Sequence, residues 1–389
     1  MQLIQVTSPA LAKEFILVNV QLNRAVPGYI RPLNAEIDEV FDPSKNKAFR
    51  HGECARWVLK DGDDRLIGRI AAFVNKKYKN KGDDVPIGGV GFFDCIDNQQ
   101  AADMLLDVAR HWLAQRGMEA MDGPINFGER DNWWGLLVEG FHEPLYGMNF
   151  NPPYYKELLE TYGFRPFFHQ LCFGLDPKKP LSSKLMQRHG VLAADPAYRA
   201  RMIEKKHLEK YAVDFVTIYN AAYAGHGGLK EMKKDQAVQL FRKMKALLDE
   251  KIVWFVYYQE KPVAMFLNIP DLNQYFKHFD GKFGLLQKFH FLWLKWRGAC
   301  HNFTGLVFAV APEFQAKGID AYMIAEAAKV TQPSTPYTHY EMQWIGDFNP
   351  KMVNIAKNMG ETFISRRLTT YRYLFDRGKE FKRHPMLAL

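Results

Sequence analysis

Hydrophobic and polar positions follow two periods along this chain, one typical of strands and one typical of helices. Alternating or continuous runs of β-branched and aromatic residues predict strands, and apolar residues spaced three and four positions apart predict helices. In the first half these patterns predict strands at 55–61, 66–78, 87–96 and 166–175, and helices at 98–117 and 151–164.

A similar order of elements recurs in the second half. The patterns there predict helices at 233–251 and 350–360 and a helix that begins after Gly318, with strands at 252–259, 262–269, 303–310, 337–345 and 368–375. Between the halves, residues 177–184 are rich in proline, lysine and serine, which is typical of a linker. We therefore predict an N-terminal domain at 1–178, a linker at 179–205 and a C-terminal domain at 206–389. Each domain is α+β, with a mixed, mainly antiparallel sheet flanked by helices.

The segment 307–329 passes from a strand through a polar loop into a helix. The strand pattern ends at Ala311 and Pro312, and Gly318 precedes the helical pattern. Such a loop leaves backbone N–H groups unpaired at a helix N-terminus, where the helix dipole favours negative charge. The loop suits a pyrophosphate. The alternative is an ordinary strand-to-helix turn in which Gly318 relieves strain.

This loop resembles the acetyl-CoA loop of the GNAT acyltransferase superfamily. That pattern is Gln or Arg, two residues, Gly, one residue, then Gly or Ala, and it falls on Gln315, Ala316, Lys317, Gly318, Ile319 and Asp320. The hairpin at 252–269 and the helix from Asn349 to Gly360 are similar to other parts of the same superfamily. The resemblance implies two tandem GNAT-like domains, with acetyl-CoA or a longer acyl-CoA as cosubstrate. It also implies that Asn349, and the backbone of Val310 and Ala311 at an expected β-bulge, contact the cosubstrate.

The first half resembles the same fold without the loop. Residues 122–141 together with 151–164 are similar to a group of bacterial tandem proteins called GNAT-like or YghO-like. The resemblance implies a degenerate N-terminal domain that does not bind CoA in the usual way.

Three features depart from the superfamily pattern. Asp320 stands where Gly or Ala is preferred, and its charge would repel the phosphates unless Lys317 or another cation compensates. Ala356 stands where many members carry a tyrosine that protonates the leaving thiolate. The insert at 270–303 is longer than a hairpin connection needs.

Transfer of an acyl group to an amine needs a group that accepts the amine's proton. We predict Glu341 for this role, with His339 and Gln343 on the same face of its strand. The alternative is that Glu341 faces solvent or pairs with a nearby arginine. Tyr371 or Tyr373 could replace the missing acid, although both could instead be core aromatic residues.

Residues 128–135 are dense in polar and aromatic side chains between two glycines. We predict that Arg130, Asn132, Trp133 and Trp134 bind the acceptor, with His226 of a glycine-rich turn as a further candidate. The alternative is that the tryptophan pair packs onto the neighbouring half. No spacing of histidine, cysteine or carboxylate residues is typical of a metal site, so we expect no metal.

Within the insert, Phe289, Leu292, Trp293 and Trp296 fall on one helical face, with Lys288, Lys295 and Arg297 nearby. This pattern predicts an interfacial helix or a cover over an acyl chain, and thus peripheral membrane contact through 283–299. The alternative is a helix packed over the sheet.

Composition narrows the function further. The chain has 389 residues, of which 47% are hydrophobic, and a formal charge of +9 that is spread along it in short clusters. These values exclude a disordered or collagen-like chain, and without an extended basic stripe we expect no nucleic-acid partner. The four cysteines lie far apart, and the first residues lack a secretory pattern, which favours a cytoplasmic location.

Together these features predict a cytoplasmic enzyme, an N-acyltransferase in which a primary amine attacks the acyl-CoA thioester directly. The acceptor is a small-molecule or lipid-like amine. Three alternatives stay open at this point: a non-catalytic protein that binds acyl-CoA, a long-chain N-acyltransferase acting on a lipid amine, and aminoacyl transfer from tRNA by a Fem-like tandem protein.

Overall fold

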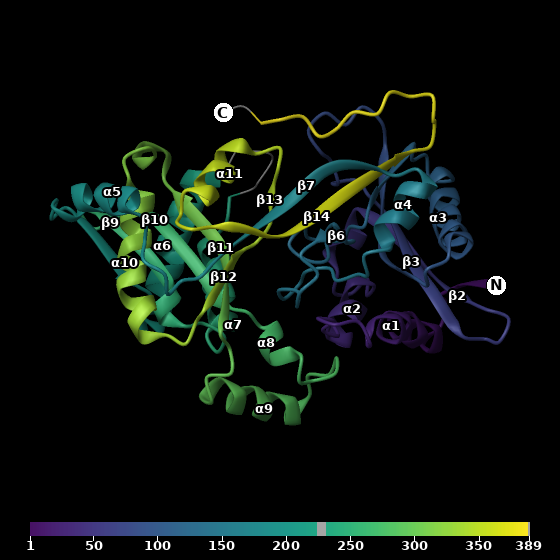
Figure 1. Ribbon diagram of the computed structural model, residues 1–389, viewed down its shortest axis with the longest axis horizontal. Helices are drawn as coiled ribbons and strands as arrows, with labels where there is room; N and C mark the ends of the chain where they lie inside the picture. The colour runs from purple at the N-terminus through teal and green to yellow at the C-terminus, as the bar shows by residue number, and fades with distance from the viewer. Residues whose placement is uncertain (224–230, 388–389) are drawn as a thin grey trace.

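The computed structural model describes residues 1–223 and 231–387. Figure 1 shows two groups of helices and strands joined by the long strands β7 and β14, which run between them. The helices are α1 Pro9–Asn23, α2 Asn34–Val40, α3 Gln99–Ala114, α4 Tyr155–Tyr162, α5 Ser183–Ala193, α6 Leu208–Tyr223, α7 Lys234–Met244, α8 Asn273–Phe276, α9 Leu285–Trp296, α10 Ile319–Ser334 and α11 Pro350–Lys357. The strands are β1 Gln2–Gln5, β2 Gly52–Lys60, β3 Leu66–Asn75, β4 Ile87–Cys95, β5 Ala120–Gly123, β6 Leu136–Glu139, β7 Arg165–Leu175, β8 Tyr198–Met202, β9 Val253–Tyr258, β10 Lys261–Pro270, β11 Asn302–Val310, β12 His339–Met342, β13 Ile345–Gly346 and β14 Phe363–Leu374.

The strands form one continuous sheet. Strands β1 to β5 lie on one side of the central pair β14 and β7, and strands β8 to β12 lie on the other. The order is β1-β2-β3-β4-β5-β14-β7-β12-β11-β10-β9-β8, with β6 beside β14 and β13 beside β7. The ladders β4·β5 and β11·β12 are parallel, and the other ladders are antiparallel. The sequence prediction of a mixed, mainly antiparallel α+β fold is therefore confirmed.

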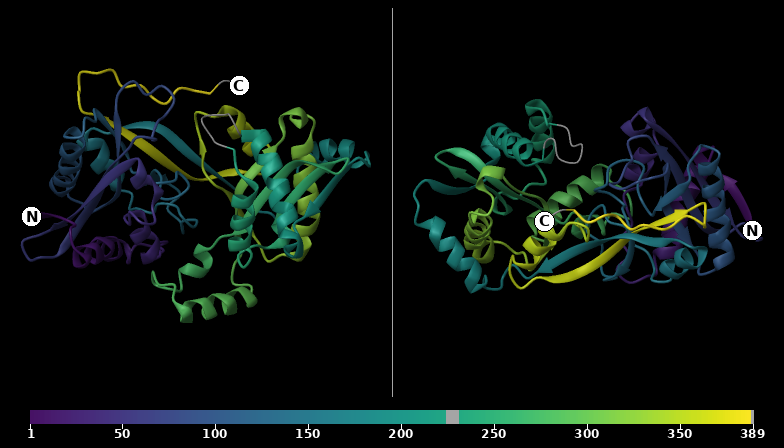
Figure 2. Two further views of the ribbon diagram at one scale, coloured as in Figure 1. Left: turned by 180° about the vertical axis from the view of Figure 1, so that it is seen from behind. Right: turned by 90° about the horizontal axis from the view of Figure 1, so that it is seen from above.

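The two central strands come from different halves of the chain. β14, near the C-terminus, lies between β5 and β7, and β7 of the first half pairs in turn with β12 of the second half. Each half thus completes the sheet of the other, as the two views of Figure 2 also show. The domain boundaries at 178 and 205 stay a prediction.

Several segments differ from the sequence expectation, and two of them lie in the second half or beside it. Residues 179–205, predicted as a linker, contain helix α5 and strand β8, because Ser182 caps α5 and β8 pairs with β9 as a sheet edge. Helix α6, for which no element was predicted, buries Tyr211, Phe215 and Ile218 against the sheet.

Helices cover both faces of the sheet in each half. In the first half, α1 and α2 pack on a cluster around Phe15 and Phe127, and α3 and α4 pack on another around Leu105 and Tyr155. In the second half, α6 and α7 enclose one cluster, and α10 packs on a larger one. Local caps fix the helix positions: Asn98 begins α3, left-handed Gly163 ends α4, and the Asn349 side chain accepts from the N–H of Met352 at the start of α11.

Candidate functional site

Strands β11 and β12 separate after a short parallel ladder. They pair only from Asn302 with His339 to Gly305 with Met342. On its other side β11 has a bulge, because Gly305 pairs with Asn268 and Val307 with Leu267, which leaves Leu306 as the extra residue. A bulge increases local twist and ends regular pairing, so it accounts for the separation of the two strands.

The separation opens a mainly apolar cleft with a volume of about 350 Å³. Its walls are the edge of β11 from Gly305 to Phe308 and the chain from Met342 to Ile345, and helices α6 and α11 contribute Tyr219, Met352 and Ala356. Because no described strand pairs with this edge of β11 beyond Gly305, the edge can accept an extended ligand.

The predicted phosphate loop lies at the end of this same strand. Ala316 and Gly318 both have left-handed backbone, with φ of 60° and 86°, so the chain turns sharply into α10. No side chain caps the N-terminus of α10, whose first N–H groups have no partner within the helix. The Gln315 side chain instead donates to the carbonyl of Val310. This arrangement can receive an anion beyond the end of β11.

The sequence analysis placed the β-bulge at Val310 and Ala311, whereas the bulge lies at Leu306. Val310 pairs with Ala264, and the N–H of Ala311 donates to the carbonyl of Val263 at 2.8 Å. The cosubstrate contacts of Val310, Ala311 and Asn349 stay predictions.

Asp320 has a cationic partner. Arg188 of α5 donates to its carboxylate at 2.5 Å, and Lys317 and Lys351 lie on the loop and on α11 beside Phe314 and Gln315. The compensating cation that the sequence analysis required is therefore Arg188, which the predicted linker supplies.

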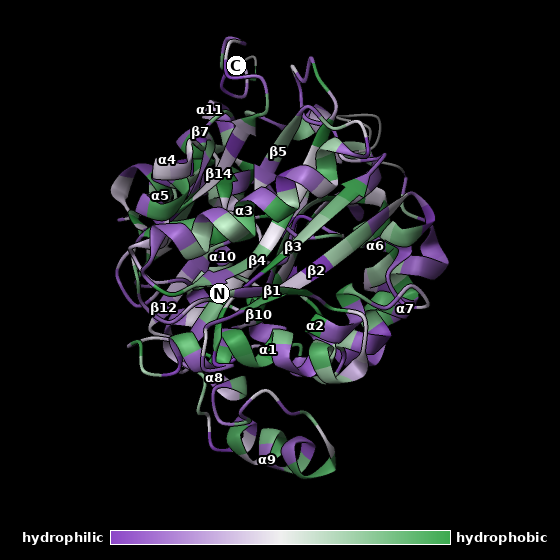
Figure 3. Ribbon diagram, turned by 90° about the vertical axis from the view of Figure 1, so that its right-hand side faces the viewer, coloured by the Kyte–Doolittle hydropathy of each residue, from purple (hydrophilic) through white to green (hydrophobic). Residues whose placement is uncertain are grey.

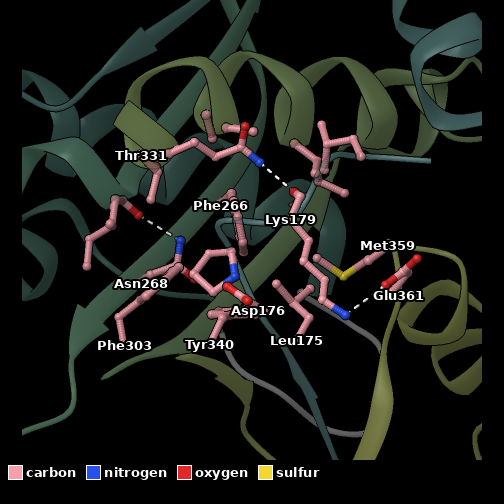
Figure 4. Close-up of a pocket in the computed structure, with 18 of the residues that line it drawn as sticks. Leu175, Asp176, Lys179, Phe266, Asn268, Phe303, Thr331, Tyr340, Met359 and Glu361 are labelled. Carbon is pink, nitrogen blue, oxygen red and sulfur yellow. Dashed lines mark hydrogen bonds and ion pairs between the residues drawn. The ribbon is translucent and has the colours of Figure 1, made fainter. Parts of the chain in front are cut away.

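A second, smaller cavity lies between α10 and the sheet (Figure 4). Most of its lining is apolar, and Phe266, Tyr340 and Met359 line both this cavity and the cleft. Asn268 also lines it, with its amide N–H donated to the Ile252 carbonyl and its buried oxygen left without a protein partner. The two spaces are thus neighbours that share three side chains.

A cluster of charged and titratable groups forms where the halves meet. Arg366 of β14 donates to both oxygens of Glu341, at 2.5 and 3.1 Å, and His339 lies 3.4 Å from the same carboxylate. His142, from the first half, lies 4.0 Å from Glu341 and 3.4 Å from Arg366. Glu341 therefore pairs with an arginine, which is the alternative that the sequence analysis left open.

The surroundings of Glu341 decide its protonation. Burial raises the pKa of this carboxyl, but the His339 hydrogen bond and the charge of Arg366 outweigh burial and lower the pKa to about 2. A carboxylate with so low a pKa is a weak proton acceptor near neutral pH, while it can orient an imidazole. Burial and the charge of Arg366 lower the pKa of His142, which favours its neutral form.

Several predicted residues lie outside the cleft. Tyr371 and Tyr373 belong to the core of the first half, where the hydroxyl of Tyr371 donates to Glu160. The four predicted acceptor-binding residues, Arg130, Asn132, Trp133 and Trp134, line a different groove in the first half, which shares no lining residue with the cleft. Trp133 and Trp134 pack on the core of that same half and not on its neighbour. His226 lies outside the described residues.

The sequence analysis missed Leu306, Arg188, His142 and Arg366. The bulge at Leu306 lies within an apolar run and has no sequence pattern of its own. Arg366 and His142 come together where strands of the two halves pair, and Arg188 contacts Asp320 from helix α5. Among residues 1–223 and 231–387, no cluster of metal-ligating side chains is found. In that same part of the chain, no helix is both long and apolar enough to cross a bilayer.

Comparison with known proteins adds a fold and one distant relative. No protein-family model matches the chain. A bacterial ceramide synthase of Caulobacter vibrioides is 24% identical over 367 residues, which cover 93% of this chain and 94% of that protein.

Two solved structures share the overall fold. A tandem GNAT protein from the clavulanic acid biosynthesis pathway matches with a TM-score of 0.53 and 10% identity, over 97% of this chain and all of that one (100%). A GNAT-type glucosamine N-acetyltransferase region of a fungal β-N-acetylglucosaminidase also gives a TM-score of 0.53 at 10% identity, over 96% of this chain and 38% of that chain. The tandem GNAT fold expected from the sequence is therefore confirmed, and membership of the YghO-like group stays a prediction.

Proposed function

We propose that this protein transfers an acyl group from an acyl-CoA thioester to the amine of a lipid-like acceptor. The observation that carries the proposal is the unpaired edge of β11 beside an apolar cleft, with the uncapped N-terminus of α10 after the end of the same strand. The amides of a pantetheine arm can add to such an edge as a further strand does, and the helix terminus suits the pyrophosphate.

The cleft and the second cavity together suit a long acyl chain, and the second cavity contributes about 70 Å³. This cavity adjoins the cleft through Phe266, Tyr340 and Met359, and the side chains around it are mostly aliphatic or aromatic. Each methylene group that leaves water for such surroundings contributes about 0.8 kcal/mol, so a long chain gains several times more than an acetyl group.

The distant relative supports a lipid acceptor. Its name describes a bacterial ceramide synthase, and the match spans nearly the whole of both chains. A ceramide is the amide of a long-chain amino alcohol and a fatty acid. We therefore propose a long-chain amine as acceptor and a long-chain acyl-CoA as donor.

In the reaction we propose, the amine nitrogen attacks the thioester carbonyl carbon, the C–S bond breaks and CoA leaves as a thiolate. Our candidate for accepting the proton that the amine loses is His339, which precedes the cleft-lining Tyr340 in β12 and does not itself line the cleft, and Glu341 acts as a positioning residue that contacts the imidazole. Tyr219, in the wall of the cleft, is our candidate for protonating the thiolate in place of the tyrosine that Ala356 lacks.

The test is release of free thiol from acetyl-CoA and palmitoyl-CoA, with a long-chain amino alcohol or a short alkylamine as acceptor. We expect release with palmitoyl-CoA and the long-chain amine, and mass spectrometry of the lipid product should show the amide. CoA binding without thiol release for any donor and acceptor pair would contradict the proposal and favour a non-catalytic acyl-CoA-binding protein.

Two variants refine the test. Ala327→Phe fills part of the second cavity, so it should lower turnover of palmitoyl-CoA by at least about tenfold relative to turnover of acetyl-CoA. Turnover of acetyl-CoA serves as the internal control for folding. Glu341→Gln should shift the pH profile of kcat if Glu341 orients His339, whereas an unchanged profile would exclude that role. We found no feature in the described part of the chain that favours aminoacyl transfer from tRNA.

A further inference from the structure

Helix α9 extends away from the rest of the molecule. It belongs to the insert between β10 and β11, and Figure 1 and the left view of Figure 2 show it below the body of the second half. Only Phe291 and Leu294 of this helix are buried, with Phe291 packed on Tyr275 at a ring distance of 4.9 Å. The Lys295 side chain donates to the carbonyl of Ala246 and ties the helix to the segment after α7.

The opposite face of α9 exposes large apolar side chains to solvent. Leu286 and Trp296 are 80% and 81% exposed, and Figure 3 shows the apolar residues along the helix. The exposed apolar side chains of α9 are Leu285, Leu286, Phe289, Leu292, Trp293 and Trp296. Such a contiguous patch on an otherwise globular protein marks a contact surface. The sequence alternative, a helix packed over the sheet, therefore does not hold for this face.

The charged side chains of α9 and of the chain next to it have one sign. Lys282, Lys288, Lys295 and Arg297 lie in or beside α9, and no aspartate or glutamate occurs from residue 281 to residue 312. Lys282, Lys288 and Arg297 are exposed, and the guanidinium of Arg297 lies over the Trp293 ring. A helix with exposed leucine and aromatic residues beside lysine and arginine suits the boundary between anionic headgroups and acyl chains.

We propose that α9 docks this protein on an anionic lipid bilayer surface, with the six exposed apolar side chains inserted at the level of the headgroups. Charge complementarity selects this occupant. A second copy of the chain would bring two sets of cations together with no carboxylate between them, which opposes self-association through this face. The proposal is independent of the acyl transfer proposed above, because it concerns only binding to lipid.

The insert joins the sheet next to the second cavity. Asn268 and Phe303, which line that cavity, lie close to the ends of β10 and β11 where the insert leaves and returns. A bilayer held by α9 is therefore at the end of the second half that contains the proposed acyl-chain site.

The test is flotation of the full-length protein with phosphatidylcholine vesicles, with and without phosphatidylglycerol. We expect the wild type to float with the anionic vesicles, and Leu286→Glu combined with Trp296→Glu to reduce the bound fraction at least tenfold. The matched control is Val191→Glu on α5, which replaces a side chain that is 73% exposed elsewhere, and it should bind as the wild type does. Unchanged thermal unfolding of each variant shows that the fold is retained.

A second pair of variants separates charge from apolar contact. Lys288→Glu combined with Arg297→Glu should abolish the preference for anionic vesicles, whereas Lys156→Glu combined with Lys184→Glu changes the net charge equally on other exposed lysines and should not. Wild-type protein that fails to float, or α9 variants that float as well as the wild type, would overturn the proposal. So would sedimentation showing that the wild type self-associates through α9 and the variants do not, in the absence of vesicle binding.

Discussion

Gly305 stands where β11 leaves β12, and its small size is required there. A Cβ at this position would lie 2.3 Å from the hydroxyl of Tyr340, a side chain that lines both the cleft and the second cavity. The backbone of the strand and the ring of Tyr340 are both fixed by packing, since Tyr340 lies against Phe303 with ring centroids 4.7 Å apart. The glycine therefore sets the shape of the site.

We expect Gly305→Ala to lower the free energy of unfolding by about 1–3 kcal/mol, because the added methyl overpacks the core. Tyr340→Phe in the same chain removes the clashing hydroxyl and should restore most of the loss. Gly62→Ala is the matched control, since nothing lies within 4 Å of a Cβ there. Denaturant unfolding measures all three, and equal costs for Gly305→Ala and Gly62→Ala would contradict the explanation.

Asp271 makes stability depend on pH. Burial raises the pKa of its carboxyl from 3.8 to about 6, although the N–H groups of Tyr146 and Asn273 donate to it. The unfolded chain ionises this group more readily. Its contribution to stability is thus fully present below pH 3.8 and is lost as the pH rises to about 6.

Asp271→Asn should therefore gain stability relative to the wild type as the pH rises, by about 2–3 kcal/mol between about pH 4 and pH 7. An asparagine oxygen can still accept both N–H groups. The exposed Asp97→Asn serves as control and should show no such trend. Unfolding curves at several pH values check this, and a difference that stays constant with pH would disprove the assignment.

At the scale of single elements, the start of α10 combines an anion site with an acidic side chain. The helix N-terminus attracts negative charge, while Asp320 in its first turn repels it and Arg188 of α5 partly neutralises Asp320. In the function we propose, the affinity for the pyrophosphate of CoA therefore depends on the contact between these two helices.

Titration of CoA into variants tests this balance. Asp320→Ala should tighten binding about 2- to 5-fold and Arg188→Ala should weaken it by a similar factor, with the double variant near the wild type. Glu157→Ala, at an exposed position of α4 in the first half, is the control for the change in charge. Weaker binding by Asp320→Ala would mean that the carboxylate helps to hold the ligand or the loop.

At the scale of the whole molecule, the exchange of β7 and β14 links the halves. Arg372 of β14 donates to Asp122 of β5 at 2.6 and 2.8 Å and to Asp83, so a strand from the end of the chain supplies the cation for two buried carboxylates of the first half. Removing one partner of such a buried pair typically costs about 3–5 kcal/mol.

We therefore expect the separate parts 1–178 and 179–389 to lack cooperative unfolding on their own, because each lacks a central strand of its sheet. Co-expression of the two should restore a soluble complex with one thermal transition, as in the full chain. Circular dichroism during heating is the measurement. A cooperative transition of 1–178 alone would show that the first half folds without β14.

The sequence by itself determined the local elements and the loop. Period and cap residues predicted the strands around the hairpin at 252–269, the helix closed by Gly117 and the turn at Gly318, because these depend on contacts between near neighbours in the chain. The tandem fold could also be predicted, since each half carries its own sequence of strands and helices.

Only the tertiary structure decided which residues meet. Arg366 pairs with Glu341, 25 positions away, and His142 of the first half lies near both, 199 and 224 positions away. Arg188 pairs with Asp320 across a separation of 132 positions. Such contacts are set by strand order and by the exchange of β7 and β14, which periodicity does not encode. The exposure of α9 was decided in the same way, because an apolar helical face has the same pattern whether a sheet, a bilayer or solvent covers it.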